Sequence, residues 1–150
     1  MSLDNARPVN VLLVEDNPAD VDLTRISFAE AKLKCHLHTV NDGVEAMAFL
    51  KKLDEWADAP TPDLILLDLN MPRKDGREVL AEIKENPELR RIPVIVLTSS
   101  DAEQDIVKSY DLHTNAYIQK PVDFEDLKNV VRALEDFWFT IVRLPPKETS

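Results

Sequence analysis

Short, mostly apolar runs alternate along the chain with stretches whose apolar residues recur every three or four positions. The short runs are rich in β-branched residues, which is typical of strands, and they cover residues 9–14, 35–40, 63–68, 92–100 and 115–119. The intervening stretches have helical spacing and begin near residues 18, 43, 76, 101 and 123. Because the strands are apolar throughout rather than alternating, helices should cover both faces of the sheet. The pattern predicts an α/β fold, a doubly wound sheet of five parallel strands.

The ends and faces of the first three helices can also be predicted. Asn17 is suited to cap the first helix and the segment Asn41-Asp42-Gly43 the second, and Pro18 fits the first turn, where its missing N–H is harmless. We expect the first helix to reach about Lys34 and the third to end near Glu85. The inward-facing residues predicted for the three helices are Val21, Ile26, Ala29 and Leu33; Ala46, Phe49, Leu50 and Leu53; and Val79, Leu80 and Ile83.

Composition narrows the classes of function. The chain has 150 residues, enough for one domain with its own core, and a formal net charge of −10. So acidic a chain is poorly suited to nucleic acid or to an anionic membrane, because both are bound through Lys and Arg. Only two glycines occur, so a glycine-rich phosphate loop cannot be assembled. The single Cys35 excludes an internal disulfide, and neither a signal peptide nor a membrane-spanning run is present, so we expect a cytoplasmic protein.

Chemically useful side chains follow the ends of the predicted strands. Glu15 and Asp16 follow the first strand, Asp68 ends the third, Thr98 lies in the fourth, and Lys120 follows the fifth. In a parallel sheet these ends share one edge, where ligands bind. Three carboxylates brought together repel one another unless a cation joins them, and all-oxygen ligands favour Mg²⁺ or Mn²⁺. A carboxylate can also attack phosphorus to form an acyl phosphate, and Asp68 is the best candidate.

At these residues the chain resembles the receiver domain of two-component response regulators. The segments that match are VLLVEDNP (11–18), LILLDLNMPRKDG (64–76), PVIVLTSS (93–100) and AYIQKP (116–121). The chain is most similar to single-domain regulators paired with bacterial and cyanobacterial phytochromes. Three segments carry this similarity: VEDNPADVDLT, DLNMPRKDG and TSSDAEQDI. The resemblance predicts a flavodoxin-like receiver domain over residues 9–137, preceded by a tail (1–8) and followed by an extension of the last helix and a tail (138–150).

The resemblance implies a role for each residue of the site. Asp68 would accept a phosphoryl group from the phosphohistidine of a sensor histidine kinase, with phytochromes as candidate kinases. Lys120 would contact the phosphoryl group, Thr98 would turn toward it, and Tyr117 would turn inward as the switch. The signal would leave through the fourth helix, fifth strand and fifth helix. The protein ligands of Mg²⁺ would be Glu15, Asp16, Asp68 and the backbone carbonyl of Asn70.

Other interpretations of the same residues remain open. An aspartyl-phosphate phosphatase of the haloacid-dehalogenase kind also places a nucleophilic Asp after an apolar strand, but it needs a second Asp where this chain has Asn70. A receiver-like binding module that is never phosphorylated is the other alternative. Without the resemblance, Thr98 and the two serines after it would be interpreted as an ordinary loop. Tyr117 would be interpreted as a packed aromatic residue. Cys35, His36 and His38 suggest a metal site, but packing or edge roles suit them better because zinc needs four ligands.

The last predicted helix carries an apolar stripe that continues beyond what one domain needs. The segment FWFTIVRLPP, residues 137–146, adds aromatic and β-branched residues to that stripe. The stripe either folds back on its own domain or forms a homodimer interface, and the dimer is the favoured interpretation because a monomer seldom exposes so large an apolar patch. The short tail leaves no room for an output domain, so we expect signalling through protein contacts, dimerisation or a phosphorelay.

Overall fold

The computed structural model of the chain describes residues 9–30, 35–69, 76–98, 116–119 and 125. Within these residues strands and helices alternate as the sequence predicts. The predicted fourth and fifth helices lie outside the described residues. The elements are β1 (Val9–Val14), α1 (Pro18–Glu30), β2 (Cys35–Val40), α2 (Gly43–Lys51), the 3₁₀ helix η2 (Asp54–Trp56), β3 (Leu64–Asp68), α3 (Gly76–Glu85), β4 (Val94–Thr98) and β5 (Ala116–Gln119).

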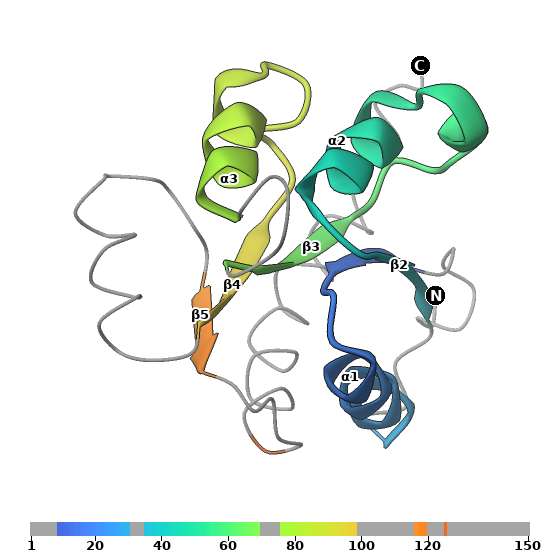
Figure 1. Cartoon of the computed structure of the whole chain (residues 1–150), viewed down its shortest axis with the longest axis vertical. Coiled ribbons are helices and arrows are strands. Elements are labelled where there is room, and N and C mark those ends of the chain that lie inside the picture. The colour runs from blue at the N-terminus through green and yellow to red at the C-terminus, as the bar shows by residue number, and fades with distance from the viewer. Residues whose placement is uncertain (1–8, 31–34, 70–75, 99–115, 120–124, 126–150) are drawn as a thin grey trace, which may run out of the picture.

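The five strands form one parallel sheet in the order β2-β1-β3-β4-β5 (Figure 1). β1 pairs with both β2 and β3, so the first strand lies inside the sheet and β2 forms one edge. From β1 onward the chain adds β3, β4 and β5 in sequence order toward the other edge. This arrangement confirms the predicted fold class, a parallel α/β sheet of the receiver type.

Helices cover both faces of the sheet, with α1 on one side and α2 and α3 on the other (Figure 1). Successive strand residues point to opposite faces, and each face has its own apolar core. On the α1 side Phe28 packs with buried residues of β1, β3 and β4. On the other side Phe49 of α2 and Leu80 of α3 pack with the remaining strand residues. Burial on both faces explains why the strands read as continuous apolar runs.

Both predicted helix caps are confirmed. The Asn17 side-chain oxygen accepts hydrogen bonds from the backbone N–H groups of Ala19 at 2.9 Å and Asp20 at 3.3 Å. The Asp42 side chain accepts from the N–H of Glu45 at 2.9 Å, and the Glu45 carboxylate accepts from the N–H of Asn41 at 2.8 Å. Each cap satisfies N–H groups that have no partner inside the helix.

The predicted inward face of α1 is wrong. Ile26 is 55% exposed and Ala29 is also exposed, whereas Thr24 and Phe28 are buried at 1% and 3%. Thr24 and Phe28, four residues apart, share the inward face, and the Thr24 hydroxyl donates to the carbonyl of Asp20 at 2.9 Å, which removes the penalty for burying it. Val21 is half-buried on the same side, as predicted, and Leu33 lies outside the described residues.

Leu53 is the second incorrect core assignment, because it is 48% exposed. α2 ends at Lys51, and Lys52 adopts the left-handed conformation with φ 59° and ψ 48°. Its N–H bonds back to the carbonyls of Ala48 and Phe49, which closes the helix before Leu53 can continue its apolar face. The other predicted core residues of α2 and α3 are buried as expected: Ala46, Phe49, Leu50, Val79, Leu80 and Ile83.

Two strands begin one or two residues later than predicted, at Leu64 and Val94. Asp63, predicted as the first residue of β3, instead pairs with the first residues of β1. Its N–H donates to the carbonyl of Asn10 at 2.7 Å, and its carboxylate accepts from the N–H of Asn10 at 2.8 Å. The side chain thus takes the place of a backbone partner at this end of the sheet.

Candidate functional site

The register of the central strands brings two acidic residues together at the carboxyl edge of the sheet. Val14 of β1 pairs with Leu67 of β3, so Glu15 and Asp68, the next residues, continue side by side. Both are buried, each with 1% of its surface exposed. Buried carboxylates at adjacent positions are unfavourable unless other groups or a cation compensate them, so this pair marks a site rather than a structural accident.

Asp16 completes a cluster of three carboxylates. One oxygen from each of Glu15, Asp16 and Asp68 lies within 4.8 Å of the other two, and Asp16 is exposed while its partners are buried. These are hard oxygen donors of the kind that hold Mg²⁺, Mn²⁺ or Ca²⁺. The exposed position of Asp16 gives the cluster access to solvent. The predicted meeting of these three residues is confirmed, and the residues present fit a divalent metal ion.

Backbone contacts hold Glu15 in place. Its N–H donates to the carbonyl of Val40 at 3.0 Å, which extends the pairing of β1 with β2 by one residue. Its carboxylate accepts from the N–H of Asn17 at 3.2 Å, at the start of α1. The first turn of a helix favours negative charge, so the same helix start both orients Glu15 and lowers the penalty for its burial.

Asp68 and Thr98 lie on neighbouring strands. Asp68 pairs with Leu97 in the register of β3 and β4, and the N–H of Leu69 donates to the carbonyl of Leu97 at 3.2 Å. Thr98 therefore follows directly beside Asp68 at the same edge, and it is 2% exposed. The predicted proximity of a hydroxyl-bearing residue to the acidic edge is confirmed at the level of strand positions.

The remaining predicted residues lie partly or wholly outside the described residues. Asn70 and Lys120 belong to segments that are not described, and for Tyr117 only the backbone within β5 is described. Gln119, the residue before Lys120, pairs with Thr98 in the sheet. The roles expected for Asn70, Lys120 and Tyr117 thus stay predictions.

Sequence reasoning placed Gly76 only at the start of a helix and missed its contact with the site. Its N–H donates to the carbonyl of Leu69 at 3.0 Å, one residue beyond Asp68. The only signals in the sequence were the Asp-Gly pair after the third strand and the scarcity of glycine in the chain. Neither signal says which backbone a glycine approaches.

The histidines of β2 pack as edge residues. His38 contacts the ring of Phe49, with centroids 5.5 Å apart, and its Nε2 lies 3.1 Å from the side-chain oxygen of Asn10. Burial lowers the pKa of His38, and the neighbouring His36 lowers it further. Among the described side chains, His36 and His38 belong to no group of three metal-ligating residues. The Cys35 side chain is not described.

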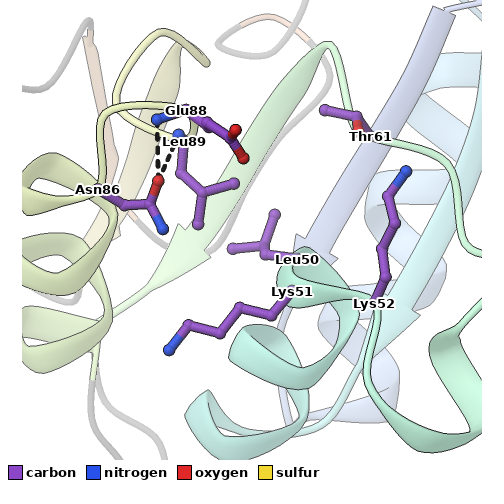
Figure 2. A pocket seen from close by; sticks show the side chains of 7 residues that line it. All are labelled: Leu50, Lys51, Lys52, Thr61, Asn86, Glu88 and Leu89. Carbon is purple, nitrogen blue, oxygen red and sulfur yellow. Dashed lines mark hydrogen bonds between the residues drawn. The ribbon is translucent and has the colours of Figure 1, made fainter.

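A pocket of about 440 Å³ lies at the opposite edge of the sheet, between the end of α2 and the turn that follows α3. Figure 2 shows Lys51 and Lys52, at the end of α2, on one side and Asn86, Glu88 and Leu89 on the other. The Lys51 ammonium forms an ion pair with the Glu82 carboxylate at 2.8 Å. The side-chain oxygen of Asn86 accepts hydrogen bonds from the backbone N–H groups of Glu88 and Leu89. Of the predicted site residues whose side chains are described, Glu15, Asp16, Asp68 and Thr98, none lines this pocket, so it is separate from the carboxylate cluster.

None of the described helices combines the length and the apolar character needed to cross a lipid bilayer.

Comparisons with known proteins agree with the geometry of the site. Residues 11–132 match the family model of the response regulator receiver domain. The response regulator Rcp1 of Synechocystis sp. is 48% identical over 145 residues, which cover 97% of this chain and 99% of the relative.

Two crystal structures are also similar. One is the phosphorylated cyanobacterial phytochrome response regulator RcpA, with a TM-score of 0.76, 50% identity and coverage of 93% of this chain and 99% of that one. The other is the Mn²⁺-bound form of Rcp1, with a TM-score of 0.75, 49% identity and coverage of 92% and 99%. With its acidic cluster at the carboxyl ends of β1 and β3, this chain belongs to the response regulator receiver family and is homologous to phytochrome response regulators.

Proposed function

We propose that Asp68 accepts a phosphoryl group from the phosphohistidine of a sensor histidine kinase and that the chain passes the signal on through protein contacts. The observation that carries this proposal is the carboxylate cluster, in which Asp68 lies buried beside Glu15 and Asp16 at the end of β3. Membership of the receiver family supports it independently.

The transfer needs a nucleophile and compensation of charge. A carboxylate oxygen of Asp68 attacks phosphorus while the bond from phosphorus to the donor imidazole nitrogen breaks, and the product is an acyl phosphate. Thr98 on the neighbouring strand is in a position to approach the new phosphoryl group, and its sheet partner Gln119 directly precedes Lys120. We assign Lys120 the compensation of phosphoryl charge and Thr98 a hydrogen bond to it.

The metal that best fits the donor set is Mg²⁺. Glu15, Asp16 and Asp68 offer carboxylate oxygens, and we assign the backbone carbonyl of Asn70 as a further ligand. When bound, the ion offsets the negative charge that three carboxylates and a phosphoryl group bring together. Mn²⁺ prefers similar oxygen ligands, and the relative Rcp1 has been crystallised in a Mn²⁺-bound form.

The proposed partner is supported by similarity to relatives, and the proposed output by the resemblance to receiver domains. Similarity to RcpA, a cyanobacterial phytochrome response regulator, supports a phytochrome as the kinase that donates the phosphoryl group. We place the output at the fourth helix, fifth strand and fifth helix, with Tyr117 turning inward when Thr98 moves toward the phosphate. Of this surface the structure describes β5, which is the edge strand beside β4.

The experiment that tests the proposal is phosphorylation by acetyl phosphate, followed by intact mass. We expect one phosphoryl group per chain when Mg²⁺ is present and none when it is chelated. The adduct should be stable in acid and labile in base, as an acyl phosphate is. Asp68→Asn should show no adduct because the amide is not a nucleophile toward phosphorus.

A matched control is Asp63→Asn, which changes a carboxylate at the opposite end of β3. It should be phosphorylated like the original chain. If the original chain takes up no phosphoryl group from acetyl phosphate or from a purified phytochrome kinase, the proposal fails and a receiver-like binding module becomes the better assignment.

We also propose that the chain forms a homodimer through its last helix, which lies outside the described residues. The proposal is supported by the apolar stripe that the sequence extends through residues 137–146. Gel filtration with light scattering, with and without acetyl phosphate, should give twice the mass of one chain, 17.1 kDa, in at least one condition. A Trp138→Glu variant should give the mass of one chain. A monomer in every condition would contradict the dimer.

A further inference from the structure

Gly76 is the first residue of α3, and it lies directly against the backbone of the segment that carries Asp68. A Cβ added at Gly76 would lie 2.6 Å from the Cα of Leu69 and 3.1 Å from the carbonyl carbon of Asp68, and still closer to the Asp68 carbonyl oxygen. Cβ atoms do not approach backbone atoms to such distances without something moving. The contact exists only because residue 76 has no side chain.

The backbone conformation of Gly76 does not itself require glycine. No described glycine has a positive φ, so the conformation is one that any residue can adopt. At such a position alanine would ordinarily stabilise the protein, because it restricts the unfolded chain and favours the helix. The glycine is therefore explained by the space it leaves for Asp68 and Leu69.

The atoms that would have to move cannot move alone. Asp68 pairs with Leu97 in the sheet, and Leu69 is held on both sides: its N–H donates to Leu97 and its carbonyl accepts from Gly76. A shift of this backbone therefore moves the Asp68 side chain relative to Glu15, which is fixed to β2 and α1. Metal ligands tolerate such shifts poorly, because their oxygens must converge on one point.

We propose that Gly76 is a positioning residue that sets the distance of the Asp68 carboxylate from Glu15 and Asp16, and thereby the affinity for the divalent ion and the rate of phosphoryl transfer. This inference rests on the proposed function of Asp68. Gly76 touches neither the ion nor the phosphoryl group and acts through the Asp68–Leu69 backbone.

The test compares Gly76→Ala with the original chain by calorimetric titration of Mg²⁺ and by the rate of phosphorylation with acetyl phosphate at saturating Mg²⁺. We expect Mg²⁺ affinity to fall roughly 10- to 100-fold, as for other residues that orient metal ligands. The phosphorylation rate should fall as well, even at saturating Mg²⁺. A purely structural role would lower the free energy of unfolding and leave the affinity of the folded protein unchanged.

The matched control is Gly43→Ala. Gly43 is the other glycine of the chain, is buried, and is also the first residue of a helix with an ordinary φ. It should keep its Mg²⁺ affinity within about twofold, because substitutions at sites that share no partner act almost independently. Wild-type affinity and rate in Gly76→Ala, or equal losses in both variants, would overturn the proposal.

Two further outcomes are also decisive. If Gly76→Ala does not fold in buffer, the titration is repeated in trimethylamine N-oxide, which favours the folded state. Failure to fold there as well would make Gly76 a requirement of the whole fold and contradict the positioning role. If the original chain neither binds Mg²⁺ nor is phosphorylated, the proposed function itself fails. If only the Gly76→Ala comparison shows no difference, the positioning role alone fails.

Discussion

At the scale of single residues, the site is made by positions far apart in the chain whose surroundings differ. Glu15 and Asp68 are buried, whereas Asp16 is exposed, although Glu15 and Asp16 are neighbours in sequence. Glu15 is held by backbone contacts to Val40 and Asn17, and Asp16 is the member of the cluster that solvent reaches.

His38 gives a prediction on pH. Burial, and to a smaller extent His36, lowers its pKa below the ordinary value of 6.5 in the folded protein. Below about pH 6.5 the unfolded chain therefore takes up a proton that the folded protein resists, and the free energy of unfolding falls. Above that pH the contribution of His38 is fully present. His38→Gln should lose less stability than the original chain between about pH 7.5 and 5.5 in urea unfolding.

The variant His36→Gln provides the complementary check. It removes the smaller of the two causes, so the pKa of His38, followed by NMR titration of its ring protons, should rise toward 6.5. An unchanged titration would mean that the distance between the rings, 6.5 Å between centroids, is too large for their charges to interact.

At the scale of elements, α1 and α2 each begin where a side chain accepts the first N–H groups of the helix. Asp42 is the sharper test, because it is 7% exposed and its carboxylate accepts from Glu45. Asp42→Ala should lower the free energy of unfolding by about 1 kcal/mol, the usual effect of removing a cap. Asp42→Asn keeps an acceptor oxygen and should stay near the original value in urea unfolding. Equal losses would assign the effect to the charge and not to the cap.

Element order and strand positions could be predicted from the sequence because apolar runs and capping residues are local signals. The inward face of α1 could not. Ile26 is the more apolar residue, yet Thr24 is buried, because Thr24 shares a helix face with Val21 and Phe28 at spacings of three and four whereas Ile26 does not, and the Thr24 hydroxyl is satisfied by the carbonyl of Asp20. Hydrophobicity alone ranks these two residues in the wrong order.

Part of the site could likewise be predicted from the sequence, and part could not. The convergence of Glu15, Asp16 and Asp68 could be predicted, because the carboxyl ends of parallel strands share an edge. The contact of Gly76 with Asp68 could not, because it depends on how closely α3 approaches the end of β3, a tertiary distance with no periodic signal. The early end of α2 before Leu53 is a similar case, since Lys52 adopts a conformation more typical of glycine.

At the scale of the whole molecule, the carboxylate cluster should couple metal binding to folding. An ion that binds only the folded protein adds about 1.4 kcal/mol to the free energy of unfolding at ten times its dissociation constant. We expect the urea concentration at the midpoint of unfolding to rise when Mg²⁺ is added and to return to its original value when the ion is chelated. Asp68→Asn should show a smaller rise, because it removes one of the three carboxylates. Equal rises in both proteins would place the ion elsewhere.

The strand order has a consequence for how the protein is made. From β1 toward β5 the strands lie in the sheet in the order in which they are synthesised, so the neighbour on the β1 side of each strand is already made when that strand leaves the ribosome. Glu15 and Asp68 are thus next to each other as soon as β3 joins β1, whereas Thr98 arrives only with β4. The acidic pair therefore belongs to strands that are synthesised earlier than Thr98, the residue expected to respond to phosphorylation, so every strand through β4 must be made before the site can hold both.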